Sequence, residues 1–165
     1  MVIPREDLLN ITMNLTEQEK IYLGGFVDGD GCINAQIVRR KDYLLKFQIR
    51  VTVSFYQKTK RHWFIKWVHK KLKYGSIRKR NDGMSEYNIV GNHAVKKVVN
   101  ELQPYIRIKQ PQVRLVLEII EKLPEAKDPL TFVALCERVD LFERLNDSKK
   151  RVITSETVRS ELGID

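Results

Sequence analysis

A nine-residue stretch, residues 23–31 with the sequence LGGFVDGDG, constrains the fold more than any other part of this chain. It continues a helix predicted over about residues 17–27, because residues 16–19, Thr-Glu-Gln-Glu, have the pattern of a capping box. Each glycine in a helix costs about 1 kcal/mol relative to alanine. Gly25 and Gly29 are four residues apart and share one face, where the absence of side chains would let a second helix approach closely.

Two carboxylates, Asp28 and Asp30, lie at the carboxyl end of this helix. The helix dipole places about half a negative charge there, so a nearby cation would be stabilising. Two copies of the helix packed through their glycines would bring two Asp30 carboxylates together, and hard oxygen ligands suit Mg²⁺. An Asp-Gly-Asp-Gly string is also typical of a simple turn, which is the alternative. An EF-hand is excluded, because its first and twelfth positions would be Phe26 and Ile37.

The charge balance indicates a polyanionic partner. Thirty Lys and Arg residues against 21 Asp and Glu residues give a formal net charge of +9, which favours nucleic acid; a basic protein without such a partner is the alternative. Cys32 and Cys136 are too few for a zinc site or a disulfide framework. No apolar run approaches the roughly 20 residues of a membrane span, and residues 1–7 do not resemble a signal peptide. We therefore expect an intracellular protein without a membrane partner.

After residue 31 the apolar pattern changes from a helical period to a period of two. Apolar and polar residues alternate over residues 33–38 and 47–55, which predicts a hairpin with one apolar face. A second hairpin of the same kind turns at residues 81–83, Asn-Asp-Gly. The other helices that we expect cover about residues 57–72, from 92 to before Pro104, 111–123, 129–145 and a short segment after Ser155.

These elements have the order α-β-β-α-β-β-α(-α-α). The order predicts an α+β fold in which helices cover one face of a four-stranded antiparallel sheet. The helix over residues 57–72 has an apolar stripe that includes Trp63, and we expect this stripe in the core rather than in base stacking. A chain of 165 residues suffices for one core, so we expect one domain over residues 1–165, with a core of about 17–145 and a C-terminal segment of about 146–165.

The uncovered face of the sheet is rich in Arg, Gln and Asn. Arg pairs well with O6 and N7 of guanine, and Gln and Asn pair with adenine, while an antiparallel ribbon fits the major groove. A plain solvated face is the alternative. The residues that we expect to contact DNA, on this face, in its turns and in the C-terminal segment, are Asn34, Gln36, Val38, Arg39, Arg40, Tyr43, Lys46, Gln48, Arg50, Thr52, Ser54, Arg78, Arg80, Glu86, Asn88, Lys149 and Lys150.

The nine residues resemble the LAGLIDADG motif of homing endonucleases. Gly24 in place of Ala is the loosest match. The motif occurs once, as in the homodimeric members, and the resemblance to single-motif enzymes encoded by algal introns extends over about residues 17–160. The residues that match the motif outright are Leu23, Gly25, Asp28, Asp30 and Gly31.

The resemblance implies a homodimeric endonuclease that recognises a long pseudo-palindromic DNA site in the major groove and promotes intron mobility. It would cut both strands across the minor groove and leave short 3′ overhangs. Mg²⁺ is the implied cofactor, with Mn²⁺ able to substitute, and an organelle, chloroplast or mitochondrion, the implied location. The implied residues are Asp30, Gln57, Arg61 and Lys109 for catalysis, Asp30 and the Gly29 carbonyl for the metal, and Leu23, Gly24, Gly25, Phe26 and Asp28 for the dimer interface.

Several alternatives stay open within this resemblance. Arg61 and Lys109 fit a contact to the DNA backbone as well as a catalytic role. Asp28 fits a structural cap near the end of the motif. A nucleic-acid-binding protein of the same fold without cleavage activity, such as an RNA maturase or a repressor, is the first rival function. A metal-binding structural module is the second, and the basic sheet face disfavours it.

Overall fold

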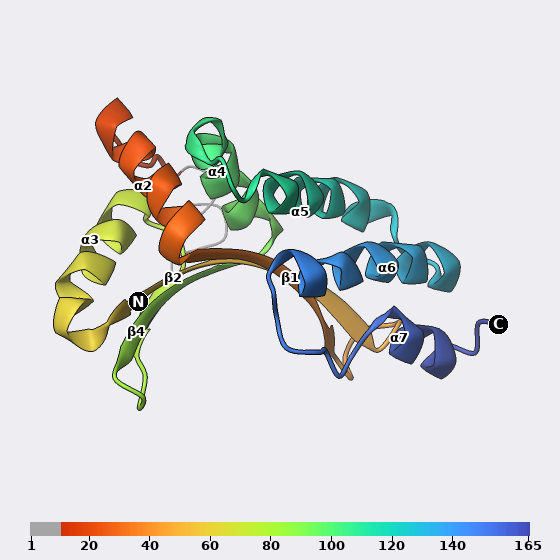
Figure 1. Cartoon of the computed structure of the whole chain (residues 1–165). Coiled ribbons are helices and arrows are strands. Elements are labelled where there is room, and N and C mark those ends of the chain that lie inside the picture. The colour runs from red at the N-terminus through yellow and green to blue at the C-terminus, as the bar shows by residue number, and fades with distance from the viewer. Residues whose placement is uncertain (1–10) are drawn as a thin grey trace. The chain divides into compact units, whose positions relative to one another are not determined.

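The structure is a computed structural model that describes residues 11–165. It has an α+β fold with a four-stranded antiparallel sheet, as predicted (Figure 1). The strand order in the sheet is β1-β2-β4-β3. The elements are α2 (Glu17–Asp30), β1 (Gly31–Arg39), β2 (Phe47–Lys58), the 3₁₀ helix η1 (Thr59–Arg61), α3 (His62–Leu72), β3 (Ser76–Lys79), β4 (Met84–Val90), α4 (Asn92–Leu102), η2 (Gln103–Tyr105), α5 (Gln110–Lys122), η3 (Leu123–Glu125), α6 (Pro129–Leu145) and α7 (Ser155–Glu161).

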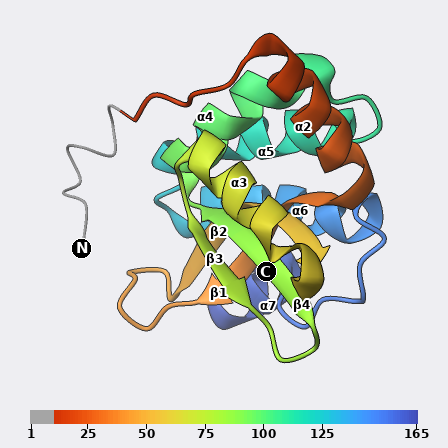
Figure 2. The ribbon, with the colours of Figure 1, turned by 90° about the vertical axis from the view of Figure 1, so that its left-hand side faces the viewer.

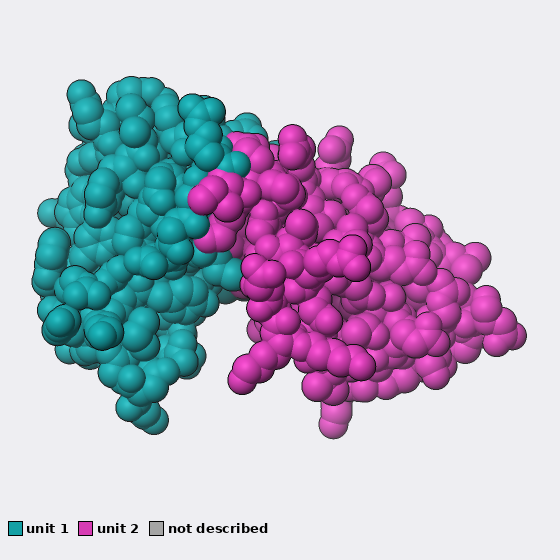
Figure 3. Space-filling view, in the orientation of Figure 1, with its two compact units in different colours: residues 1–32, 53–107 teal, residues 33–52, 108–165 magenta. Residues whose placement is uncertain are grey.

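The chain forms two compact units, which Figure 3 colours separately. Unit 1 consists of residues 1–32 and 53–107, and unit 2 of residues 33–52 and 108–165. The single domain over residues 1–165 stays a prediction. Within the described part of the chain, residues 11–165, we find no helix with the length and apolar character that a bilayer crossing requires.

Helix α2 of unit 1 begins at the predicted capping box. The Thr16 hydroxyl accepts from the Glu19 N–H at 3.2 Å, and the Glu19 carboxylate accepts from the Thr16 N–H at 3.0 Å. The helix α2 ends at Asp30, three residues beyond the predicted end. It continues because the N–H of Gly31 still donates to carbonyls of the last turn. Asp30 therefore belongs to the helix itself.

The second part of unit 1 differs from the prediction of a helix over residues 57–72. Strand β2 continues through Lys58, and α3 begins only at His62 and packs against β3 and β4 (Figure 2). The prediction of Trp63 in the core is wrong, since this side chain is 66% exposed. One residue turns a helix by about 100°, which carries Trp63 off the buried stripe. That stripe consists of Phe64, Ile65, Val68 and Leu72.

Unit 2 contains residues 33–52 of the first hairpin and the last three α-helices. The alternation in β1 and β2 is as predicted, because every second side chain is buried on one face of the hairpin. Helices α5 and α6 pack against each other, and α7 packs on α6. The buried residues of this hairpin within unit 2 are Ile33, Ala35, Ile37, Phe47, Ile49 and Val51.

Candidate active site and nucleic-acid interface

Three of the four predicted catalytic residues meet at the carboxyl end of α2. Gln57, near the end of β2, donates from its amide nitrogen to Oδ2 of Asp30 at 3.2 Å. Arg61, the last residue of η1, donates from Nε to the Gln57 amide oxygen at 2.5 Å. Asp30 and Arg61 are exposed. The site is thus a carboxylate, an amide and a guanidinium joined in series and open to solvent.

The course of the chain explains why these residues meet. The extra residues of β2 carry Gln57 to the end of α2, where a helix over the same residues would have turned it differently. The backbone N–H of Thr59 then donates to the Gly83 carbonyl at 2.8 Å. This bond holds the start of η1, and with it Arg61, against the turn of the second hairpin.

Lys109, the fourth predicted catalytic residue, belongs to unit 2. It is the N-cap residue of α5, and its carbonyl accepts from the Val113 N–H at 3.0 Å. Its catalytic role stays a prediction.

The predicted metal ligands, Asp30 and the Gly29 carbonyl, lie at the end of α2. Among residues 11–165 there is no group of three or more His, Cys, Asp or Glu side chains that would hold a metal ion. Asp30 offers a carboxylate, and the last carbonyls of a helix, Gly29 among them here, lack partners within the helix. Hard oxygen donors of this kind fit Mg²⁺, and a second copy of Asp30 would complete a carboxylate pair.

The motif helix presents an open face and a packed face. Among residues 11–165, a Cβ added at Gly25 or Gly29 would meet no atom within 4 Å, whereas one at Gly24 would lie 2.5 Å from Cβ of Tyr105. Leu23 is fully buried in unit 1. Leu23 and Gly24 are therefore packed within the unit, whereas the face of α2 with Gly25 and Gly29 is open in the described part of the chain.

The two other residues predicted for the dimer interface also have partners in unit 1. Asp28 accepts a hydrogen bond from the backbone N–H of Arg107 at 2.7 Å, which is the contact of a structural cap. Phe26 is half-buried, and its ring stacks on that of Phe55 with centroids 6.0 Å apart. The Phe26 ring also stacks on the ring of Tyr22, an exposed residue one turn earlier in α2.

Two of the residues predicted to contact DNA have side-chain partners within unit 2, and their contact with DNA stays a prediction. The Asn34 side-chain oxygen accepts from Arg151 at 2.6 Å and from Asn146 at 3.3 Å. Arg39 pairs with Glu161 of α7 at 2.6 Å. Arg39 continues the alternation of β1, in which every second residue from position 33 to position 37 is buried on the same face. Its side chain therefore leaves the sheet on the face that carries the buried residues.

Arg151 was not among the residues predicted from the sequence. Its guanidinium also donates to the Ala35 carbonyl at 2.6 Å, and it thereby ties the C-terminal segment to β1. Only the polar character of residues 146–151 signals such a role, because the partners lie more than 100 positions away in the chain. Lys149 and Lys150, the predicted DNA contacts of this segment, are exposed.

The tip of the first hairpin, residues 40–46, is a closed loop. The backbone N–H of Arg40 donates to the Lys46 carbonyl at 2.9 Å, and the Arg40 carbonyl accepts from the Tyr43 N–H at 3.1 Å. The Arg40 guanidinium lies over the Tyr43 ring, 4.6 Å from the centroid, and donates to both oxygens of Asp42 and to Gln48. The other predicted contacts of unit 2, exposed or half-buried, are Gln36, Val38, Arg50 and Thr52.

The polar face of the second hairpin is organised around a buried carboxylate. Glu86 is 5% exposed, pairs with Arg78 opposite it in the ladder, and lies 3.6 Å from a guanidinium nitrogen of Arg80. Asn88 donates to Glu86 at 3.0 Å and accepts from Ser54 at 2.6 Å. All five residues were predicted to contact DNA, and the structure joins them into one hydrogen-bonded group.

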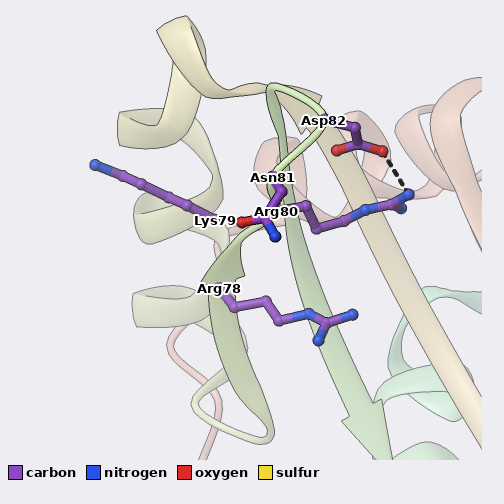
Figure 4. A pocket seen from close by; sticks show the side chains of 5 residues that line it. All are labelled: Arg78, Lys79, Arg80, Asn81 and Asp82. Atoms are coloured by element: carbon purple, nitrogen blue, oxygen red, sulfur yellow. Dashed lines mark hydrogen bonds and ion pairs between the residues drawn. The ribbon is translucent and has the colours of Figure 1, made fainter.

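A pocket beside this hairpin shows how its cations are directed (Figure 4). Arg78 and Arg80 extend to the same side, while Lys79 extends to the other. Arg80 also pairs with Asp82 at 2.6 Å. The guanidinium groups therefore project together from the polar face.

A profile described as LAGLIDADG endonuclease matches residues 23–120 of this chain. The DNA endonuclease I-CvuI of Chlorella vulgaris is 48% identical over 147 residues, which cover 88% of this chain and 91% of that protein. The DNA endonuclease I-CreI of Chlamydomonas reinhardtii is 43% identical over 143 residues, which cover 86% of this chain and 87% of that protein.

Solved structures agree with these similarities. The crystal structure of I-CvuI in complex with the I-CreI target has a TM-score of 0.85 and 46% identity, and covers 89% of this chain and 94% of that one. The archaeal intron-encoded I-Vdi141I complexed with DNA has a TM-score of 0.78 at 18% identity, and covers 89% of this chain and 96% of that one. At that identity the similarity concerns the fold alone.

Proposed function

Because this chain belongs to the LAGLIDADG endonuclease family, we propose that it is a site-specific homing endonuclease that cleaves double-stranded DNA. The observation that carries the proposal is 48% identity over 88% of the chain to I-CvuI, a DNA endonuclease. The junction of Asp30, Gln57 and Arg61 supports it, because an exposed carboxylate beside an amide and a cation suits phosphodiester hydrolysis.

A divalent cation is the proposed cofactor, with Mg²⁺ as the natural ion and Mn²⁺ as a substitute. Asp30 and the Gly29 carbonyl would hold it. I-CvuI was crystallised with DNA in the presence of 2 mM Mg, with the DNA not cleaved, and in the presence of 2 mM Ca, which supports a role for such ions. When bound, the ion would supply Lewis-acid stabilisation of charge on the scissile phosphate.

The side chains around Asp30 have separate proposed roles. Gln57 holds one Asp30 oxygen through its amide N–H, and would order the attacking water beside that carboxylate. Arg61 would stabilise the negative charge that develops on the phosphate, since a guanidinium held in place needs little reorganisation. Lys109 would add a second cation. A contact to the DNA backbone is the competing role for Arg61 and Lys109.

The active enzyme is proposed to be a homodimer joined through the open face of α2. One copy of the chain provides a single motif and a single Asp30 for a reaction that cuts two strands. The open positions Gly25 and Gly29 would let a second α2 approach closely. Two sheets would then read the halves of a long pseudo-palindromic site, and the cuts across the minor groove would leave short 3′ overhangs. Intron mobility in an organelle, such as the chloroplast, is the proposed role.

Cleavage of defined and random DNA tests this function. The full chain is incubated with Mg²⁺ and either the I-CreI target, which I-CvuI binds, or a library of randomised duplexes, and the cut ends are sequenced. We expect double-strand breaks with short 3′ overhangs, their loss in EDTA, and their recovery with Mn²⁺. Asp30→Asn should lower the cleavage rate at least about 100-fold and leave DNA binding intact. Glu121→Gln, an exposed charge-matched change on α5, should cleave like the wild type.

Distinct outcomes separate the alternatives. Specific binding without cleavage of any duplex would identify the cleavage-inactive binding protein of the same fold. Cleavage by Asp30→Asn at the wild-type rate would show that the site is assigned wrongly even though the function holds. Sedimentation as a monomer at micromolar concentration would contradict the dimer.

A further inference from the structure

At the tip of the first hairpin, the Asp42 carboxylate accepts two hydrogen bonds from the guanidinium of Arg40. We call this pair the Asp42–Arg40 clamp. Nε of Arg40 donates to Oδ1 of Asp42 at 3.0 Å, and a terminal nitrogen donates to Oδ2 at 2.8 Å. The other terminal nitrogen donates to the amide oxygen of Gln48 at 3.0 Å. This is the side-on bidentate geometry, the strongest arrangement between these two groups. The hydrogen bond from Arg40 lowers the pKa of the Asp42 carboxyl, so the pair is ionised at neutral pH.

The clamp lies on the polar face of the sheet. Gln48 alternates along β2 with Phe47 and Ile49, which are buried on the opposite face. Arg40 donates to Gln48 and therefore lies on the face that is expected to meet DNA. The Tyr43 ring under the guanidinium and the backbone bonds that close residues 40–46 restrict its movement further.

The clamp leaves Arg40 a defined set of donors. A guanidinium has five N–H groups. Within the described chain, residues 11–165, Asp42 takes two of them and Gln48 takes one, so two remain, one on each terminal nitrogen. Two N–H groups on the terminal nitrogens match the two acceptors, O6 and N7, that guanine presents in the major groove.

We propose that Asp42 is a specificity-determining residue: it positions Arg40 so that the two remaining donors of its guanidinium read a guanine in each half of the DNA site. The inference rests on the proposed DNA-binding function and names the residue that controls one base of the target. Asp42 also neutralises Arg40, which reduces the gain from contacts to phosphates of any sequence. Asp42 itself need not touch DNA.

Selection from a randomised duplex library, with Ca²⁺ in place of Mg²⁺, tests the role of Asp42. Wild-type protein and Arg40→Ala are compared first, and the base pair at which guanine preference depends on Arg40 is identified from the sequenced pools. We expect Asp42→Asn to lower the guanine preference at that same base pair about tenfold, since a bidentate contact discriminates by 1–3 kcal/mol. Its binding to random DNA should strengthen, with a steeper salt dependence, because a negative charge is lost.

Three controls isolate the clamp. Glu121→Gln removes the same charge from an exposed position of α5 and should leave the guanine preference unchanged. Asp82→Asn, in the second hairpin, should change no preference at the base pair read by Arg40. In the Arg40→Ala background, Asp42→Asn should have no further effect at that base pair, which a general change in binding would not predict.

Several results would overturn the inference. Unchanged guanine preference in Asp42→Asn would show that Arg40 does not depend on the clamp, and a sharper preference would show that Asp42 competes with DNA for Arg40. An Arg40→Ala pool identical to the wild-type pool would exclude Arg40 as a base reader. If the wild type enriches no sequence at all, the proposed function fails and this inference fails with it.

Discussion

The two hairpin tips carry the same short pattern, an arginine followed two residues later by an aspartate, and use it differently. In the first tip both oxygens of Asp42 hold Arg40. In the second tip Asp82 holds Arg80 with one oxygen, while the other accepts from the backbone N–H of Met84 at 3.2 Å. The first aspartate therefore directs both oxygens at the arginine, whereas the second divides its oxygens between the arginine and the turn.

The strand residue that supports each arginine differs as well. Neutral Gln48 supports Arg40, whereas the buried carboxylate of Glu86 supports both Arg78 and Arg80. The same spacing of arginine and aspartate can therefore give a single guanidinium held separately, as at Arg40. It can also give two arginines that share one carboxylate, as at Arg78 and Arg80. A change at the first tip should affect one base contact, and a change at Glu86 should affect two arginines and the fold together.

Glu86→Gln should have the largest effect on stability. It removes the charge of a nearly buried carboxylate, which leaves Arg78 without this counter-ion and Arg80 with Asp82 only. We expect a loss of about 1–3 kcal/mol in the free energy of unfolding, measured by urea denaturation, because the arginines are partly exposed and solvent screens them. Gln48→Ala in the first hairpin is the matched change and should cost less than about 1 kcal/mol. Equal losses for the two variants would contradict the coupled group.

The second expected effect separates the two tasks of Asp82. Asp82→Ala removes both the Arg80 contact and the acceptor for Met84, and should lower the unfolding free energy by about 1 kcal/mol. Asp82→Asn retains an acceptor for the turn and should recover most of this loss. At the first tip, where both Asp42 oxygens accept from Arg40, Asp42→Ala and Asp42→Asn should differ less than the Asp82 variants in thermal or urea denaturation.

Much of the fold follows from local patterns in the sequence. The capping box at residues 16–19, the alternation in β1 and the helix over residues 129–145 appear as predicted, because each depends on neighbours within one element. The extension of β2 through Lys58 was not predictable in this way. It depends on the bond between Thr59 and Gly83, which are distant in sequence.

In the candidate site, too, the residue types were predictable from the sequence, and their distant contacts were not. The residue types at Asp30, Gln57 and Arg61 were identified from the resemblance, yet their hydrogen-bonded series depends on where β2 ends. Asn34 was predicted to contact DNA because it alternates with apolar residues, and that contact stays a prediction. Its engagement by Arg151 depends on how the C-terminal segment returns to β1, which no spacing reveals.

Backbone strain offers a smaller test of the difference between the tips. Lys46 in the first tip and Gly83 in the second both have positive φ, of 61° and 80°. A non-glycine residue in this region costs about 1 kcal/mol, so Gly83→Lys should lower the unfolding free energy by about that amount. Lys46→Gly should raise it by about 0.5 kcal/mol, since relief of strain is partly offset by the entropy of glycine in the unfolded chain. A loss of stability in Lys46→Gly would show that the lysine side chain contributes more than its backbone costs.

The pH response of Asp42 is the smallest expected effect and the most local one. Its hydrogen bonds to Arg40, and then to the backbone, lower its pKa below the ordinary value of 3.8. A lowered folded-state pKa means that the pair contributes its full stability above about pH 3.8 and loses it as the pH falls through the lower folded-state value. A carboxyl titration followed by NMR should show this lowered pKa in the wild type and its return toward 3.8 in Arg40→Ala. Arg80→Ala should leave the titration of Asp42 unchanged, because Arg80 and its partner Asp82 are not part of the Asp42–Arg40 clamp. If Asp42 titrates alike with and without Arg40, the two oxygens do not hold the guanidinium in solution, and the first tip is no more ordered than the second.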